Sequence, residues 1–198
     1  IFATMATPAG FGADDSRWDT SRICRFNEVL GFYGLPYWYT WQVTVLGLGP
    51  IWMSDNEAAK HRTADLLGEG NVFAFGLSEK AHGADLYSTE MSVRPVGDGR
   101  YIADGRKYYI GNANAAGLVS TFGRMADSDE YVFFLADPNR SGYTCVQNVV
   151  HSQNYVAEYE LAGYELTDDE ILSRGDAAWD AALNTVNIGK FNLGWASI

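Results

Sequence analysis

The chain has 198 residues, of which 47% are hydrophobic and 14% aromatic. This composition argues against a disordered polypeptide and provides a core for one or two domains. The formal net charge of −11 argues against nucleic acid and anionic membranes as partners, because both carry negative charge. The isolated Cys24 and Cys145 predict neither a disulfide framework nor a zinc site, and they indicate a reducing, cytoplasmic environment. His61, His82 and His151 share no ligand spacing, so we expect no metal.

The ends of the chain predict a fragment of a longer protein. The chain begins at Ile1 without an initiator methionine and stops at Ile198 inside a helical pattern. Its first residues have no basic region ahead of a hydrophobic run, so they do not resemble a signal peptide.

Two helices are predicted early in the chain. The first follows Asp15 and Ser16 and ends near residues 31–34, where glycines interrupt an amphipathic pattern. The second is opened by Pro36 and covers Tyr37–Leu48, which is almost wholly apolar. This apolar stretch is short for a bilayer, and Gln, Gly and Pro residues interrupt it, so we expect a buried helix and no membrane span.

A third helix has the clearest start signal. Ser54 is followed three residues later by Glu57, which predicts a capping box at the N-terminus. The helix should run through Leu67 and stop at Gly68 or Gly70.

From Asn71 the hydrophobic period becomes that of β-strands. Gly97-Asp98-Gly99 and Asp104-Gly105 predict hairpin turns. Short strands at this spacing indicate an antiparallel β-barrel or sandwich. The predicted strands are Phe73–Leu77, Ser88–Val96, Arg100–Ala103, Lys107–Ile110, Gly117–Gly123, Tyr131–Ala136, Tyr143–Val150 and Tyr155–Leu161.

The last segment returns to a helical period. Ser173 is the predicted cap, and one apolar face is expected to contain Trp179, Leu183, Val186 and Leu193. The whole pattern predicts an α+β fold in which helices precede a β domain and a helix follows it. The expected domains are 1–70 (helical, partial), 71–169 (middle β domain) and 170–198 (start of a C-terminal helical domain).

Two motifs carry a resemblance to a known family. Phe75–Asp85 reads FGLSEKAHGAD, and Gly105–Asn112 reads GRKYYIGN. The first is similar to the acyl-CoA dehydrogenase signature of apolar, x, Leu, Thr or Ser, Glu, three variable residues, Gly, Ser, Asp. The second resembles the family's Gly-x-Lys-x-aromatic-Ile-Thr/Ser-Asn. The two motifs are in register, with helices on both sides, and the resemblance covers roughly residues 37–198.

The resemblance implies an FAD site in the middle domain. Glu79 and Asp85 would be structural and order the loop after the first strand. Ala84 stands where the family has the serine that contacts the acyl-CoA substrate. Gly111 stands where the family has a hydroxyl residue, so a side-chain hydrogen bond beside the flavin N5 is lost. The cofactor-binding residues implied are Phe75, Leu77, Ser78, Tyr109, Ile110 and Gly111.

No catalytic base is expected in this chain. Family members remove the α-proton of an acyl-CoA with a glutamate late in the C-terminal helical domain, which would lie beyond Ile198. A minority place it on the first helix of that domain, just before a basic residue. Gly189 occupies that position here, ahead of Lys190, so we expect the chain alone to be inactive.

The function implied by the resemblance is dehydrogenation of an acyl-CoA thioester to the trans-2-enoyl-CoA, as in fatty-acid β-oxidation. The base would take the α-proton while hydride passes to the flavin. An electron-transferring flavoprotein would be the acceptor, and the protein would form a homodimer or tetramer. Three alternatives stay open: a flavin-dependent monooxygenase of the same fold, a non-catalytic subunit of the family, and an unrelated β-barrel binding module.

Overall fold

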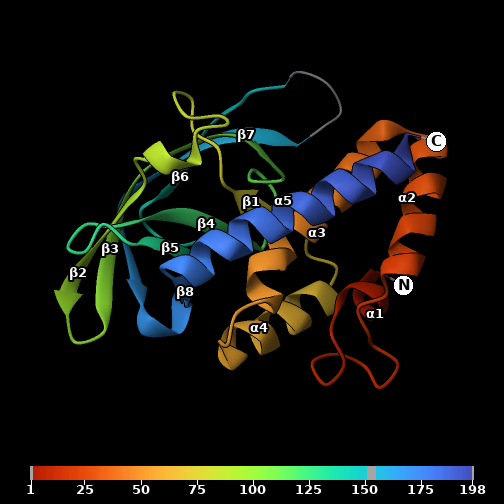
Figure 1. Ribbon diagram of the computed structural model, residues 1–198, viewed down its shortest axis with the longest axis horizontal. Coiled ribbons are helices and arrows are strands. Elements are labelled where there is room, and N and C mark those ends of the chain that lie inside the picture. The colour runs from red at the N-terminus through yellow and green to blue at the C-terminus, as the bar shows by residue number, and fades with distance from the viewer. Residues whose placement is uncertain (1, 151–154, 198) are drawn as a thin grey trace.

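The computed structural model describes residues 2–150 and 155–197, and it has the α+β architecture expected from the sequence (Figure 1). His151 and Ile198, which entered the predictions above, lie outside the described residues. The helices are α1 (Phe2–Ala6), α2 (Thr20–Tyr33), α3 (Leu35–Trp52), α4 (Glu57–Gly68) and α5 (Asp176–Ala196). The strands are β1 (Phe73–Gly76), β2 (Ser92–Gly97), β3 (Arg100–Gly111), β4 (Leu118–Met125), β5 (Tyr131–Ala136), β6 (Tyr143–Asn148), β7 (Val156–Thr167) and β8 (Ile171–Arg174).

The strands form one eight-stranded mixed sheet. Its order is β6-β7-β3-β2-β4-β5-β8, with β1 paired to β4 beside this path. The pairings of β4 with β1 and β2 are parallel, and the remaining pairings are antiparallel. Among the described residues the path does not close on itself, so the β domain is an open sheet rather than a complete barrel. This topology brings β1 and the end of β3 under the helical layer.

β3 is one long strand, so the hairpin turn predicted at Asp104-Gly105 is wrong. The strand bulges there instead, with a register shift against β7 between Ala103 and Gly105. Gly105 has a φ of +148°, and a Cβ at this position would lie 2.9 Å from Met91 Cα. Gly105 therefore meets two conditions that commonly require a glycine inside a strand, a bulge and the close approach of another backbone segment.

α3 is the buried helix expected from its composition, and it continues past the predicted end to Trp52. Gly47 lets it lie directly on β1, because a Cβ there would be 2.7 Å from Ala74 N. Ser120 on β4 donates a hydrogen bond to the Gly47 carbonyl at 2.6 Å, which fixes the helix to the sheet. In the described part of the chain, no helix is at once long enough and apolar enough to cross a membrane.

α5 crosses α3 through small residues, not through the large apolar face predicted. Ala178, Ala182 and Thr185 are buried, whereas Leu183 and Leu193 are 41% and 50% exposed. The helices are so close that a Cβ on Gly49 of α3 would lie 2.5 Å from Thr185 Oγ1. The predicted cap was also wrong: Ser173 lies in β8, and α5 begins after Gly175.

The starts of α2 and α4 differ from the predicted caps. Asp19 caps α2 by accepting a hydrogen bond from the Arg22 N–H. Asn56 caps α4, and its Oδ1 accepts a hydrogen bond from the Ala59 N–H at 2.9 Å. Ser54 instead ends α3, because its hydroxyl donates to the Ile51 carbonyl at 2.7 Å. The identity of the capping residue therefore depends on where the chain leaves the preceding helix. The local sequence pattern does not contain this information.

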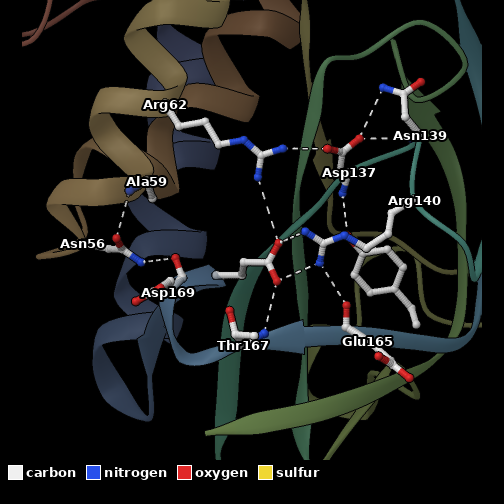
Figure 2. Close-up of polar contacts among 11 residues, drawn as sticks. Asn56, Ala59, Arg62, Asp137, Asn139, Arg140, Glu165, Thr167 and Asp169 are labelled. Atoms are coloured by element: carbon white, nitrogen blue, oxygen red, sulfur yellow. Dashed lines mark hydrogen bonds and ion pairs between the residues drawn. The ribbon is translucent and has the colours of Figure 1, made fainter.

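A polar network attaches α4 to the sheet (Figure 2). Arg62 on α4 pairs with Asp137, which follows β5, at 2.6 Å. The nearly buried Glu170 accepts hydrogen bonds from Arg140 Nη1 at 2.8 Å and from the Thr167 N–H at 3.1 Å. These contacts join the α4 surface, the β5–β6 connection and the end of β7 in one place.

Asn56 also connects α4 to this region, and its hydrogen bonds lead to a prediction about stability. Its Nδ2 donates to the carbonyls of Asp169 (2.8 Å) and Ile171 (3.0 Å). We expect Asn56→Ala to lower the free energy of unfolding by about 2 kcal/mol, of which about 1 kcal/mol is the lost N-cap and about 1 kcal/mol the two carbonyls left without a donor. Urea unfolding followed by circular dichroism measures it.

Asn139→Ala is the matched control, because it removes an exposed amide from the same network (Figure 2). Its effect should stay within about 0.5 kcal/mol. Equal losses for the two variants would contradict a capping role for Asn56.

Candidate functional site

A cavity of about 380 Å³ lies between α3, α5 and the ends of β1 and β3. The strand side is formed by Phe75, Leu77, Ser78, Tyr109, Ile110 and Gly111. The helix side is formed by Trp38, Tyr39, Gln42, Val43 and Leu46 of α3 and by Val186, Gly189, Lys190 and Leu193 of α5. All six residues that the resemblance assigned to the cofactor therefore line one cavity, although they come from two motifs about 30 residues apart in the sequence.

Ala84, the residue assigned to the substrate, is not among the lining residues of this cavity. It is exposed on the loop between β1 and β2. Of the aromatic residues at 37–41, Trp38 and Trp41 are buried, whereas Tyr37 is 67% exposed.

Asn112 brings the two strand ends and α3 together. Its buried Nδ2 lies within hydrogen-bond distance of the Thr40 carbonyl (2.9 Å), Thr44 Oγ1 (3.1 Å) and the Phe73 carbonyl (3.1 Å). Its backbone is left-handed, with a φ of +64°, a conformation that asparagine tolerates better than most residues. The last residue of the GRKYYIGN motif is thus the link that positions the cavity walls.

Tyr109 is turned into the cavity by a distortion of β3. The register against β7 shifts between Lys107 and Ile110, and Tyr109 has a φ of +63°. A bulky residue in this region costs of order 1–3 kcal/mol and recurs at functional sites. Its ring is 56% exposed, so a broad aromatic face is available to a ligand in the cavity.

Gly111 is required by the close packing of α3. A Cβ at this position would lie 2.6 Å from Val43 Cγ1 and 2.9 Å from Tyr39 Oη. The hydroxyl side chain that the family carries here would therefore collide with the helix. The departure from the family motif is explained by what α3 places against β3.

Ser78 has one part of its hydrogen-bonding capacity already used. Its hydroxyl donates to the Tyr108 carbonyl at 2.8 Å, and its own carbonyl accepts from the Tyr108 N–H at 2.9 Å. The Ser78 oxygen can therefore accept a hydrogen bond from a ligand N–H, but it has no proton left to donate.

A buried ion pair supports the floor of the site. Lys107 is 0% exposed, and its ammonium donates to the Leu77 carbonyl (2.9 Å), Glu79 Oε1 (2.7 Å) and Thr89 Oγ1 (3.1 Å). Glu79 also accepts from the backbone N–H groups of Glu90 and Met91. The pair therefore fixes Leu77, a cavity residue, together with the loop between β1 and β2.

Burial and the charge of the partner shift the pKa of each group in opposite directions. Burial lowers the pKa of Lys107 to about 8, although Glu79 works in the opposite direction. Burial on its own would raise the pKa of Glu79, but the Lys107 ammonium and the hydrogen bonds outweigh it and hold that pKa below its usual value. Both groups are therefore charged near neutral pH, as a matched pair.

Among the residues that the structure describes, Glu79, His82 and Glu90 form the one group whose ligand atoms lie close enough together to hold a metal ion, all within 4.8 Å of one another. The Glu79 oxygens already accept the hydrogen bonds described above, and Glu90 is largely exposed. A cation there would have to displace the Lys107 ammonium. The cluster is better described as a salt bridge with a surface histidine beside it.

Two polar atoms on the helix side were not identified from the sequence. Trp38 Nε1 and Gln42 Oε1 are buried without a hydrogen-bond partner among the described residues, and both side chains line the cavity. Gln42 Nε2 donates to the Gly189 carbonyl at 3.2 Å. The apolar helix pattern hid these residues, because only the crossing of α5 over α3 makes this face a cavity wall.

The ion pair predicts an acid-sensitive component of stability. A depressed folded-state pKa for Glu79 means that its contribution is complete above the unfolded value of about 4.5 and is lost as the pH falls through the folded pKa. Thermal unfolding between pH 7 and pH 3 measures it. At pH 7, Glu79→Gln should cost about 3–5 kcal/mol, because it leaves the Lys107 ammonium buried without a counter-charge.

Glu90→Gln is the control on the same loop, since that carboxylate is exposed and its charge should matter little. The double variant Glu79→Gln/Lys107→Met should be more stable than Glu79→Gln alone. If the melting temperatures of wild type and Glu79→Gln differed little and fell in parallel below pH 5, the pair would make no such contribution.

No protein-family model matches the chain, but curated relatives do. The short-chain specific acyl-CoA dehydrogenase of Megasphaera elsdenii is 30% identical over 139 residues, which is 67% of this chain and 36% of that protein. The acyl-CoA dehydrogenase of Bacillus subtilis (strain 168) is 25% identical over 158 residues, which is 76% of this chain and 41% of that protein. The chain thus spans less than half the length of these relatives.

Solved structures share the fold at lower identity. Butyryl-CoA dehydrogenase from Megasphaera elsdenii superimposes with a TM-score of 0.87 at 20% identity, over 98% of this chain and 53% of that one. An acyl-CoA dehydrogenase complexed with FAD from Bacillus anthracis gives 0.82 at 20% identity, over 98% and 34%. A nitroalkane oxidase gives 0.86 at 14% identity, over 98% and 53%. The resemblance found in the two motifs is confirmed by these relatives, and the chain belongs to the acyl-CoA dehydrogenase family.

Proposed function

We propose that the protein holds FAD in the cavity between α3, α5 and the ends of β1 and β3, and that it dehydrogenates an acyl-CoA thioester to the trans-2-enoyl-CoA. The observation that carries the proposal is the convergence of both family motifs on this one cavity. The curated relatives are named as acyl-CoA dehydrogenases, and one structure of this fold was determined with FAD.

The residues of the cavity fit a flat, mostly apolar cofactor with a few polar edges. Phe75, Leu77 and Ile110 give an apolar surface, and Tyr109 presents an exposed ring. A predominantly apolar cavity with a few convergent polar groups is the usual form of a cofactor site. Trp38 Nε1, which has no hydrogen-bond partner among the described residues, and the acceptor oxygen of Ser78 supply such groups. FAD itself would supply the hydride acceptor.

The chain's own residues bind and orient, and the proton acceptor is proposed to come from outside the described residues. No aspartate or glutamate lines this cavity in the described part of the chain. A Cβ on Gly189 would lie 2.8 Å from Leu46 Cδ2, so a longer residue there would require the Leu46 side chain to shift. A carboxylate within hydrogen-bond reach of the α-proton is needed for general-base catalysis.

Together with this function we propose the domain boundaries, the electron acceptor, the oligomeric state and the compartment. The domains would be 1–70, 71–169 and 170–198, although β8 follows residue 169 and pairs with β5. An electron-transferring flavoprotein would accept the electrons, and the protein would be a homodimer or tetramer. Cys24 and Cys145 are both free thiols, which supports a reducing, cytoplasmic compartment.

The test is the visible spectrum of the full-length protein, recorded without oxygen before and after a mixture of acyl-CoA thioesters is added. We expect an oxidised flavin spectrum that bleaches on addition. A flavin that stays oxidised would favour the second candidate, an oxidase or monooxygenase of the same fold, as in the nitroalkane oxidase. A purified protein without flavin, and unable to take up added FAD, would exclude the proposal.

Tyr109 should contribute measurably to FAD affinity. An aromatic contact contributes about 0.5–1.5 kcal/mol, so Tyr109→Ala should weaken FAD binding by about twofold to tenfold. Fluorescence titration of the apoprotein with FAD measures this. Tyr108→Ala is the matched control, because Tyr108 contacts Ser78 through its backbone and does not line the cavity. An equal loss in the two variants would show that Tyr109 is not a contact of the cofactor.

A further inference from the structure

The hydroxyl of Tyr39 reaches the point on β3 where the family motif would carry a hydroxyl side chain. Tyr39 Oη lies 2.9 Å from the position that a Cβ on Gly111 would occupy. Tyr39 comes from α3 and Gly111 from β3, so the coincidence is a product of helix–sheet packing. Residue 111 of the strand has no hydroxyl side chain, and the hydroxyl of Tyr39 on α3 lies close to the same place.

This hydroxyl is free to serve a ligand. Tyr39 lines the cavity, and the described residues provide no hydrogen-bond partner for its Oη. Burial, with a smaller effect of the nearby Tyr109, raises the pKa of Tyr39 to about 12. The phenol is therefore neutral under physiological conditions and carries a proton that it can donate.

The position of Tyr39 is fixed on both sides. The carbonyl of its neighbour Thr40 accepts a hydrogen bond from the Asn112 amide at 2.9 Å. One turn further along α3, Val43 packs against Gly111, with Cγ1 2.6 Å from the site of the missing Cβ. Both contacts lie beside Gly111, so they hold the backbone of α3 around Tyr39 against the end of β3.

We propose that Tyr39 is a positioning residue whose hydroxyl donates a hydrogen bond to the edge of the flavin ring that lies against Gly111, an inference that rests on the proposed function. A hydrogen bond to an acceptor strengthens when that acceptor gains negative charge. Reduction of the flavin adds electron density to the ring. The Tyr39 hydroxyl should therefore stabilise the reduced cofactor more than the oxidised one.

The experiment compares wild type, Tyr39→Phe and Tyr37→Phe in the full-length protein. Phenylalanine keeps the aromatic ring and removes only the hydroxyl. Tyr37 lies on the same helix, does not line this cavity and is 67% exposed, so it is the matched control. The readouts are the dissociation constant for FAD and the midpoint potential of the bound flavin at pH 7.

We expect Tyr39→Phe to reduce the preference for reduced over oxidised flavin by about tenfold, which for a two-electron couple lowers the midpoint potential by about 30 mV. The control should keep the wild-type potential. Wild-type values in Tyr39→Phe, in a protein that binds FAD, would overturn the role of Tyr39 and leave the proposed function intact. A wild-type protein that binds no FAD would overturn both.

Discussion

The amide of Asn112 is the contact on which the arrangement of the cavity depends. It is buried at the end of β3 and bonds to α3 and to β1 at the same time. A buried amide without partners is unfavourable, so α3 can approach the sheet only where its Thr40 carbonyl and Thr44 hydroxyl meet this group. The cavity walls are consequently fixed in register with one another before any ligand is considered.

The ion pair of Lys107 and Glu79 also holds neighbouring segments together beside the site, but its burial costs more desolvation free energy. Two charges are removed from water and compensate each other at 2.7 Å. Their hydrogen bonds also satisfy Thr89, the Leu77 carbonyl and the Glu90 N–H, which lies just before β2. Such a pair adds little net stability compared with apolar residues, but its hydrogen bonds connect the loop between β1 and β2 to β3. The Lys107 ammonium also binds the carbonyl of Leu77, which lines the cavity.

Close packing explains why residue 111 departs from the family pattern. Glycines at 47 and 49 let α3 lie against β1 and α5, and Gly111 lets β3 approach Val43 and Tyr39. At each of these contacts, the absence of a side chain on the glycine lets the neighbouring segment approach more closely. A hydroxyl on residue 111 would be incompatible with the helix, so any polar contact at this point has to come from α3. The chemistry of the site and the packing of the helix are thus a single constraint.

The sequence by itself determined the α+β order and the buried nature of α3, and its two motifs carried the resemblance to the family. Those features are local: hydrophobic periods, turn residues and two short motifs are read without knowing what lies opposite. Only the tertiary structure decided that Asp104-Gly105 is a bulge, that Asn56 rather than Ser54 caps α4, and that α5 buries alanines while Leu183 stays exposed. It also decided that Tyr39, Gln42 and Trp38 face the cavity. Each of these outcomes depends on a neighbour far away in the chain, because steric contact and hydrogen-bond satisfaction act between segments that the sequence does not place side by side.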